Sequence, residues 1–279
     1  MVTNPPFVIS PDNAYLLRDS DATGDELSRD VVRSCAATLT EGGFASVMCN
    51  WIHAAGDWQA PLREWLSGLG CDALLLHVTS YEPLAYAITW NSTDADSDPE
   101  KFSDTVTRWV SHYRSAGVAR IATGLVILRR RSSASNWVRA LDGCARPRGR
   151  SGEHLQLLFE AGDVLATPGA GQLGELLSGA WRLVDGHRLS QGADYVDGAY
   201  TGEAMLSRRP DTGIRATFDP LVLELLVGCD GSRSLGEVIE RAAIPGGFTR
   251  GEFHSLCLKA VKDLIARGYL VAMAADSAG

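Results

Sequence analysis

The residues with the most definite chemistry stand at the start of the chain, in the motif Asn4-Pro5-Pro6-Phe7. Adjacent prolines lack the N–H groups that a central strand needs, so the motif predicts a strand end followed by a rigid loop. An amine bonded to an aromatic base or to an acyl carbon is a poor nucleophile, because its lone pair is delocalised. The side-chain oxygen of Asn4 and the backbone carbonyl of Pro5 can accept the two N–H groups of such an amine, and Phe7 can stack on a flat substrate. The motif therefore predicts a site that orients a planar nitrogen toward an electrophile.

Chance alone explains this motif poorly. An apolar residue, a spacer, Asn or Asp, two prolines and an aromatic residue should occur in roughly one in a thousand chains of this length. The alternative is a rigid turn at the end of a strand, in which Asn4 caps the following segment. The alternating helix and strand pattern after the motif favours the amine-binding interpretation.

The motif and the elements that follow it resemble a known family. Residues 4–7, the next helix, the strand Phe44–Cys49 and the closing strand Ala119–Leu128 look like the second half of a class I S-adenosylmethionine-dependent methyltransferase of the small-domain N-methyltransferase group. That group acts on exocyclic amines of guanine or adenine in RNA and DNA, and on the glutamine side chain of release factors. The longer pattern NPPFVISP looks like an actinobacterial branch of unassigned substrate. The resemblance implies that the four motif residues hold the substrate amine.

The catalytic domain of that family has an N-terminal half that binds the cofactor, and this half has no counterpart in this sequence. In the family, the Asn-Pro-Pro loop follows the fourth strand of a seven-stranded sheet. The earlier strands carry the glycine-rich loop and the acidic residue that hold S-adenosylmethionine, whereas only three residues precede Asn4 here. We therefore expect an incomplete Rossmann-like sheet whose missing N-terminal half comes from a longer gene product or from a complementing chain. We also expect little S-adenosylmethionine binding by this chain alone.

A basic segment lies near the middle of the chain. Residues 129–150 contain seven arginines and a single acidic residue, Asp142. Arg129, Arg130 and Arg131 are candidate contacts to a nucleic-acid phosphate backbone beside the site. The alternative is a solvated linker, and the acidic regions on both sides oppose steering of a polyanion toward the segment.

Other residues with catalytic or metal-binding chemistry form no motif. The six cysteines stand far apart, without a C-x-x-C pair or a histidine at zinc-ligand spacing, so we expect reduced, mostly buried thiols and no metal site. His53 and His77 follow predicted strands and can face the site, but we interpret each as a partly exposed strand-end or loop histidine. The spacing shows no Ser-His-Asp triad, so it does not favour a hydrolase.

Hydrophobic periodicity divides the chain into two regions of α/β character. In the first region, helices are predicted over 25–39, 60–69 and 99–116, and buried strands of the parallel-sheet type over 44–49, 73–79 and 119–128. In the second, residues 153–184 are mainly helical and precede strands at 203–207 and 214–218, helices near 220–228, 234–243 and 250–267, and a strand at 269–273. We predict the C-terminal half of a catalytic domain at 1–131, an arginine-rich linker at 132–150 and a winged-helix-like α+β domain at 151–279.

Composition narrows the function classes further. The chain has 279 residues, 45% of them hydrophobic and 22% charged, with a net charge of -8, which excludes disorder along its whole length. It has no run of 18 apolar residues and no secretory signal pattern, so we expect a cytoplasmic protein without a membrane partner. The expected function is methyl transfer to a planar exocyclic amine or amide nitrogen, with a nucleic-acid base as the leading substrate. A protein glutamine is the alternative substrate, and a non-catalytic module that binds nucleic acid or protein is the alternative of another class.

Overall fold

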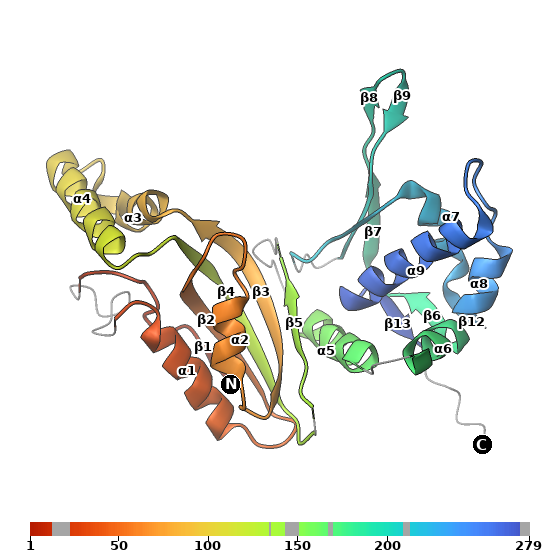
Figure 1. Ribbon diagram of the computed structural model, residues 1–279, viewed down its shortest axis with the longest axis horizontal. Coiled ribbons are helices and arrows are strands. Elements are labelled where there is room, and N and C mark those ends of the chain that lie inside the picture. The colour runs from red at the N-terminus through yellow and green to blue at the C-terminus, as the bar shows by residue number, and fades with distance from the viewer. Residues whose placement is uncertain (13–22, 134, 143–150, 167–169, 209–212, 274–279) are drawn as a thin grey trace. The chain divides into compact units, whose positions relative to one another are not determined.

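The computed structural model describes residues 1–12, 23–133, 135–142, 151–166, 170–208 and 213–273 (Figure 1). The chain divides into two compact units, Met1–Gly143 and Cys144–Gly279, and each combines helices with open sheets. The chain is thus of mixed α/β class. The boundary falls inside the segment 132–150 that we predicted to be a linker, but the first unit extends beyond residue 131.

The first unit contains five strands and four α-helices among its described residues. The strands are β1 (Val2–Thr3), β2 (Phe44–His53), β3 (Cys71–Tyr81), β4 (Arg120–Arg130) and β5 (Val138–Leu141). The helices are α1 (Glu26–Thr38), α2 (Ala60–Leu66), α3 (Pro83–Asn91) and α4 (Pro99–Ser115), with a short 3-10 turn, η1 (Ser92–Asp94). The predicted helices and strands are all present in the predicted order, but α3 and η1 were not predicted. The strands are longer than predicted, and β5 lies in the expected linker.

The strands form one mixed sheet in the order β1-β2-β4-β3-β5. β1 runs parallel to β2, and β5 runs parallel to β3. The central strand β4 is antiparallel to both of its neighbours, so the expectation of a parallel sheet is wrong for the middle of the sheet. Apolar strands buried on both faces are compatible with either direction, and the pairing partner is not encoded in the apolar run itself.

Helices cover the two faces of this sheet with different partners (Figure 1). On one face, α1 and α2 pack against alternate residues of β2, β3 and β4 and bury Val32, Trp65 and Val47. On the other face, α3 and α4 pack at one end of the sheet with the segment after β1, around Tyr86 and Ile121. Because successive strand residues point to opposite faces, each strand contributes to both clusters.

The second unit is built from three short sheets and five α-helices among its described residues. The helices are α5 (Gly152–Ala166), α6 (Ala170–Ser178), α7 (Leu223–Gly228), α8 (Leu235–Arg241) and α9 (Arg250–Ala266), with a 3-10 turn, η2 (Pro220–Val222). The strands are β6 (Ala180–Leu183), β7 (His187–Gln191), β8 (Asp194–Val196), β9 (Ala199–Thr201), β10 (Ala204–Arg208), β11 (Ala216–Phe218), β12 (Asp230–Ser234) and β13 (Leu270–Ala272). Their sheets have the orders β11-β10-β7, β12-β6-β13 and β8-β9.

Two helices of this unit begin at well-formed N-caps. Ser234 caps α8 and Thr249 caps α9, and in each case the glutamate at the third helical position, Glu237 or Glu252, bonds back to the capping residue. Such capping boxes satisfy backbone N–H groups that the helix itself leaves unpaired. The inner face of α9 supplies Phe253 and other apolar residues to the core of the unit.

Candidate functional site

The Asn-Pro-Pro motif lies where a short strand ends at one edge of the first sheet. Val2 and Thr3 pair with Ser46 and Val47 of β2, and the chain leaves the sheet at Asn4. The Asn4 side chain is exposed and has no hydrogen-bond partner among the described residues. Its side-chain amide is therefore accessible from solvent. The next three residues are half-buried.

Two tyrosines from the helices on that face fix the segment after the motif. The N–H of Ile9 donates to the Tyr86 hydroxyl at 3.1 Å, and the Tyr113 hydroxyl donates to the Ile9 carbonyl at 2.6 Å. Val8 and Ile9 are buried, with 5% and 2% of their surface exposed. The motif is thus held between β1 on one side and this anchor on the other, so its loop conformation is fixed by contacts on both sides.

A buried polar network continues from this anchor into the sheet. Asn50 of β2 donates to the Tyr86 hydroxyl and accepts from Thr123 Oγ1 at 2.7 Å. Asn50 is fully buried, and a buried amide without partners is costly, so these contacts hold both residues in place. The network ties β2, β4 and α3 together beneath the loop.

An aromatic side chain of α3 lies beside the motif. The Phe7 ring meets Trp90 edge to face, with centroids 6.1 Å apart and an interplanar angle of 80°. Trp90 in turn lies 6.1 Å from the ring of Tyr86. Phe7 is half-buried, so Trp90 fixes its orientation while part of the ring stays open. An aromatic ring held in this way can pack against a flat substrate.

An ion pair secures the same segment further along the chain. Asp12 contacts the guanidinium of Arg108 and accepts from Trp109 Nε1 at 2.7 Å. The hydrogen bond to Asp12 raises the pKa of Arg108 above its usual value. Both partners of Asp12 come from α4, so this helix holds the segment at two successive points.

The three arginines that we predicted as phosphate contacts bind within the first unit. Arg129 Nη2 and Arg131 Nε donate to the buried carboxylate of Asp72 at 2.6 and 2.5 Å. Arg130 Nη1 donates to the Leu69 carbonyl at 2.7 Å. Burial favours the protonated form of Asp72, but the hydrogen bonds from Arg131 and Arg129 outweigh it and lower its pKa. These contacts give the arginines a structural role in the sheet. The later arginines of the basic segment, at 146, 148 and 150, lie outside the described residues.

Two histidines belong to a cluster that the sequence did not predict. Only 6% of the surface of His53 and 8% of that of His77 are exposed, so the prediction of partly exposed histidines is wrong. Both imidazoles reach the hydroxyl of Ser80, and His77 also contacts Asp142. No spacing in the sequence indicates this cluster, because its members come from β2, β3 and the residue after β5.

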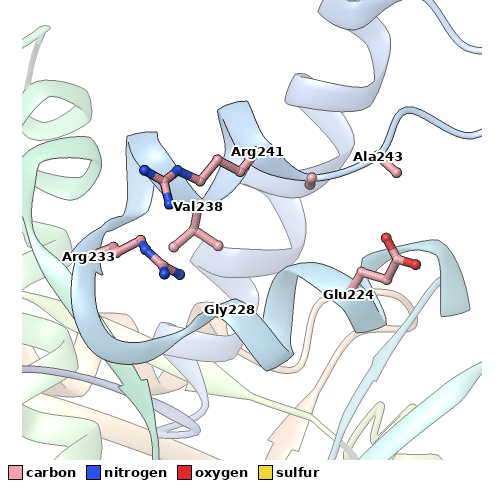
Figure 2. Close-up of a pocket in the computed structure, with 7 residues that line it drawn as sticks. Glu224, Gly228, Arg233, Val238, Arg241 and Ala243 are labelled. Carbon is pink, nitrogen blue, oxygen red and sulfur yellow. The ribbon is translucent and has the colours of Figure 1, made fainter.

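The second unit has a shallow pocket with charged walls, which Figure 2 shows. It has a volume of about 240 Å³ and lies beside Val238 of α8, with Arg233, Arg241 and Glu224 among its lining residues. All three charged side chains belong to exposed residues. The pocket joins α7, β12 and α8 but brings together no nucleophile, base or metal-ligand set.

Cysteine and metal chemistry contribute no further site in the described part of the chain. The five described cysteines are free and buried, and burial raises the pKa of the Cys49 thiol to about 12. Within the same residues no group of three or more Cys, His, Asp or Glu side chains is placed to hold a metal ion. Among the helices of the described segments, none has the length and apolar character to cross a bilayer.

Comparison with known proteins adds no assignment. No protein-family model matches the chain. No curated protein matches it either.

Proposed function

We propose that this chain carries the acceptor-binding half of an N-methyltransferase that acts on a planar exocyclic amine or amide nitrogen. The observation that carries the proposal is the state of Asn4, which is exposed at the end of β1 and has no hydrogen-bond partner among the described residues. If Asn4 were only a turn-capping residue, its side chain would bond to a nearby backbone N–H. The described residues contain no such bond, which favours the ligand-binding role.

The residues of the loop would act on the acceptor nitrogen. The Asn4 oxygen and the Pro5 carbonyl accept the two N–H groups, which holds the lone pair in one direction. As a new bond forms, positive charge develops on the nitrogen, and both hydrogen bonds become stronger. The anchor at Ile9 keeps the loop fixed, so little reorganisation is needed during the reaction. Phe7 would stack on the flat group that carries the nitrogen.

The arrangement of strands supports the same proposal. If the loop follows the fourth of seven strands, three more strands should complete the sheet. β2, β3 and β4 follow, and β4 lies between the other two. β5 is an addition at the far edge, next to β3.

The methyl donor that the resemblance implies is S-adenosylmethionine, and our proposal places its site outside the described residues of this chain. β1 is an edge strand, and the described residues place no further strand and no glycine-rich loop beside it. We assign no residue of this chain to the donor. Further strands that pair with the open edge of β1 would have to supply its site.

We infer the substrate class from the Asn-Pro-Pro loop and not from the arginines at 129–131, because these bind Asp72 and backbone carbonyls. A nucleic-acid base is our first candidate, and a protein glutamine is the second. The sheet β12-β6-β13 with α8 and α9 is compatible with a winged-helix-like appendage that would orient either substrate.

The test is Asn4→Ala in this chain combined with the strands that complete its sheet, supplied with labelled S-adenosylmethionine and separate RNA, DNA and protein fractions. Loss of one preorganised hydrogen-bonding group should lower kcat by about 10²- to 10³-fold. Asn4→Asp is the matched control, because it keeps an acceptor oxygen and should retain more activity than the alanine variant. Donor binding, measured by calorimetry, should not change.

Undiminished turnover of the Asn4→Ala variant would refute the assignment of Asn4. A second measurement addresses the donor. Calorimetric titration of this chain alone with S-adenosylmethionine should show no binding. Tight binding would contradict our proposal that the donor site lies outside the described residues.

A further inference from the structure

Four side chains form a continuous line of hydrogen bonds on the face of the first sheet opposite the Asn-Pro-Pro loop. His77 contacts the Asp142 carboxylate through Nδ1 and Ser80 Oγ through Nε2, the latter at 2.9 Å. Ser80 Oγ lies 2.8 Å from Nε2 of His53, and Nδ1 of His53 lies 2.7 Å from the Ala54 carbonyl oxygen. A hydroxyl is thus held between two imidazoles, and each imidazole is oriented by an oxygen.

A β-bulge in β3 brings His77 and Ser80 to the same face. In a regular strand, residues three positions apart point to opposite faces. Here His77 pairs with Gly124, whereas Thr79 pairs with the next residue of β4, so Val78 is an extra residue without a partner in this ladder. The bulge shifts the alternation by one. The hydroxyl of Ser80 therefore meets the imidazole of His77.

Small residues of β4 lie on the same face as the cluster. Alternate residues of β4 share this face and pair with the three members of the cluster on β2 and β3: Arg120 with His53, Ala122 with Ser80, and Gly124 with His77. A Cβ atom at Gly124 would lie 2.2 Å from the Leu76 carbonyl oxygen. Only glycine fits there, because the Leu76 carbonyl and the Trp51 ring occupy the space that a side chain would need.

The hydrogen bonds determine how many protons the cluster holds. A carbonyl oxygen only accepts, so Nδ1 of His53 carries a proton, and Nδ1 of His77 likewise donates to the Asp142 carboxylate. Each remaining contact, between Ser80 Oγ and one Nε2, needs one proton, and the hydroxyl provides only one. For all four bonds to form, one imidazole must be an imidazolium and the other neutral.

The surroundings assign the neutral form to His53. Burial lowers the pKa of His53. The hydrogen bond to Ala54 and the charge of Asp57 oppose this effect, whereas the positive charge of Arg120 adds to it. His53 is then the acceptor of the Ser80 proton, and His77, beside Asp142, is the donor to Ser80 Oγ.

We propose that Ser80 is a nucleophile toward activated acyl compounds such as esters, with His53 as its general base. A base within hydrogen-bond reach of a hydroxyl, oriented in turn by a third group, is the arrangement that activates serine. His77, held by Asp142, fixes the position of Ser80 Oγ. Because the site lies on the opposite face from the loop, this proposal does not rest on the methyltransferase proposal.

The bonds formed and broken in the acyl transfer, and the proton that moves, can be followed atom by atom. Ser80 Oγ forms a bond to the carbonyl carbon, its proton passes to Nε2 of His53, and the carbonyl electron pair moves to oxygen. When this electron pair re-forms the carbonyl double bond, the bond to the leaving alkoxide breaks, and the alkoxide takes the proton from His53. Water then repeats the sequence on the acyl-serine and releases the carboxylic acid.

The partly exposed indole of Trp58 forms an apolar wall beside this site, with the buried indole of Trp51 behind it. The Trp58 ring stacks on His77 with centroids 4.8 Å apart and an interplanar angle of 17°, and Trp51 lies 6.2 Å from the same imidazole. Ser80 itself is partly exposed, so a small reagent can reach it. The wall favours an apolar acyl group over a charged one.

The experiment is treatment of the intact chain with a fluorophosphonate probe, followed by peptide mapping by mass spectrometry. Attack by Ser80 Oγ breaks the P–F bond, releases fluoride and leaves the phosphonyl group on the peptide that contains Ser80. His53→Gln should slow labelling by about 10²- to 10⁴-fold, the usual contribution of a general base. Ser115→Ala is the control, because Ser115 is exposed and its hydroxyl bonds to the His112 carbonyl rather than to an imidazole.

The site of labelling in the parent protein decides the outcome, so the result does not depend on whether a variant folds. Labelling of Ser80 that falls in His53→Gln and persists in Ser115→Ala supports the proposal. A folded parent protein that carries no adduct on Ser80 overturns it. Equal labelling rates of Ser80 and of exposed serines such as Ser115 overturn it as well, because an activated hydroxyl must react faster.

Discussion

Replacement of Asp72 by alanine should destabilise the first unit more than any surface substitution. The Asp72 carboxylate is fully buried and accepts hydrogen bonds from Arg129 and Arg131 and from the Trp137 backbone N–H, the last at 3.1 Å. Removal of one partner of a buried ion pair costs about 3 to 5 kcal/mol. The side chains of Arg129 and Arg131 are 15% and 33% exposed and can partly turn to water, so the lower value applies.

A loss of about 3 kcal/mol should lower the Tm of a unit of this size by about 10 °C. Tryptophan fluorescence is a suitable signal, because of the seven tryptophans only Trp181 lies outside the first unit. Asp30→Asn is the control. Asp30 is exposed and pairs with Arg29 at 3.2 Å, so its loss should change the free energy of unfolding by no more than about 0.5 kcal/mol.

The stabilisation by Asp72 should depend on pH in one direction. Its pKa is lowered in the folded chain, so its contribution is complete above the ordinary aspartate value of about 4 and disappears as the pH falls through the lower folded value. The parent and the Asp72→Ala variant should therefore differ most between about pH 5 and pH 8 and converge in strong acid. A difference below about 1 kcal/mol at pH 7, or one that does not change with acid, would refute the ion-pair argument.

Two further predictions test other parts of the fold. Gly124→Ala places a Cβ atom 2.2 Å from the Leu76 carbonyl oxygen and should cost about 3 kcal/mol in thermal unfolding. Gly174→Ala, in a helix with nothing within 4 Å of the added atom, should be neutral or stabilising, and an equal loss in both variants would contradict the crowding argument. Thr249→Ala removes the N-cap of α9 and should cost about 1 kcal/mol in urea unfolding followed by circular dichroism. An unchanged midpoint would show that the cap contributes nothing there.

Three of the four α-helices described in the first unit could be predicted from the sequence because their signals are local, whereas α3 was not predicted. The apolar stripe over 25–39 corresponds to α1, and that over 99–116 corresponds to α4. Both depend only on residues three and four positions apart. β5 was missed because its four residues lie in a segment that looks like a linker by charge. Its pairing with Ala73–Leu76 of β3 is decided by distant residues.

Short polar strands of the second unit were missed for a similar reason. β12 contains the sequence Asp-Gly-Ser-Arg-Ser, which has no apolar alternation. It pairs with β6 at Asp230 and Ser234 with an irregular register. Nothing local distinguishes such a segment from a turn.

In the candidate site at Asn4, too, some features follow from local sequence rules and others depend on distant residues. The exposed end of β1 at Asn4 follows from two prolines in succession, which is a local rule. The anchors Tyr86 and Tyr113 are 77 and 104 residues away from Ile9, so only the fold reveals them. The charge of the basic segment was visible in the sequence, but the buried partner of its first arginines, Asp72, was not.

The extra residue in β3 makes the chemistry of this strand depend on its length. Loss of Val78 would leave every member of the histidine and serine cluster in the sequence, yet the regular alternation would turn Ser80 away from His77. Tyr81, which packs with the opposite cluster, would change sides as well. Scanning by single substitutions would not detect this dependence, whereas a one-residue deletion or insertion between His77 and Ser80 would expose it. Natural variants that differ in length here should differ in reactivity even where their side chains are the same.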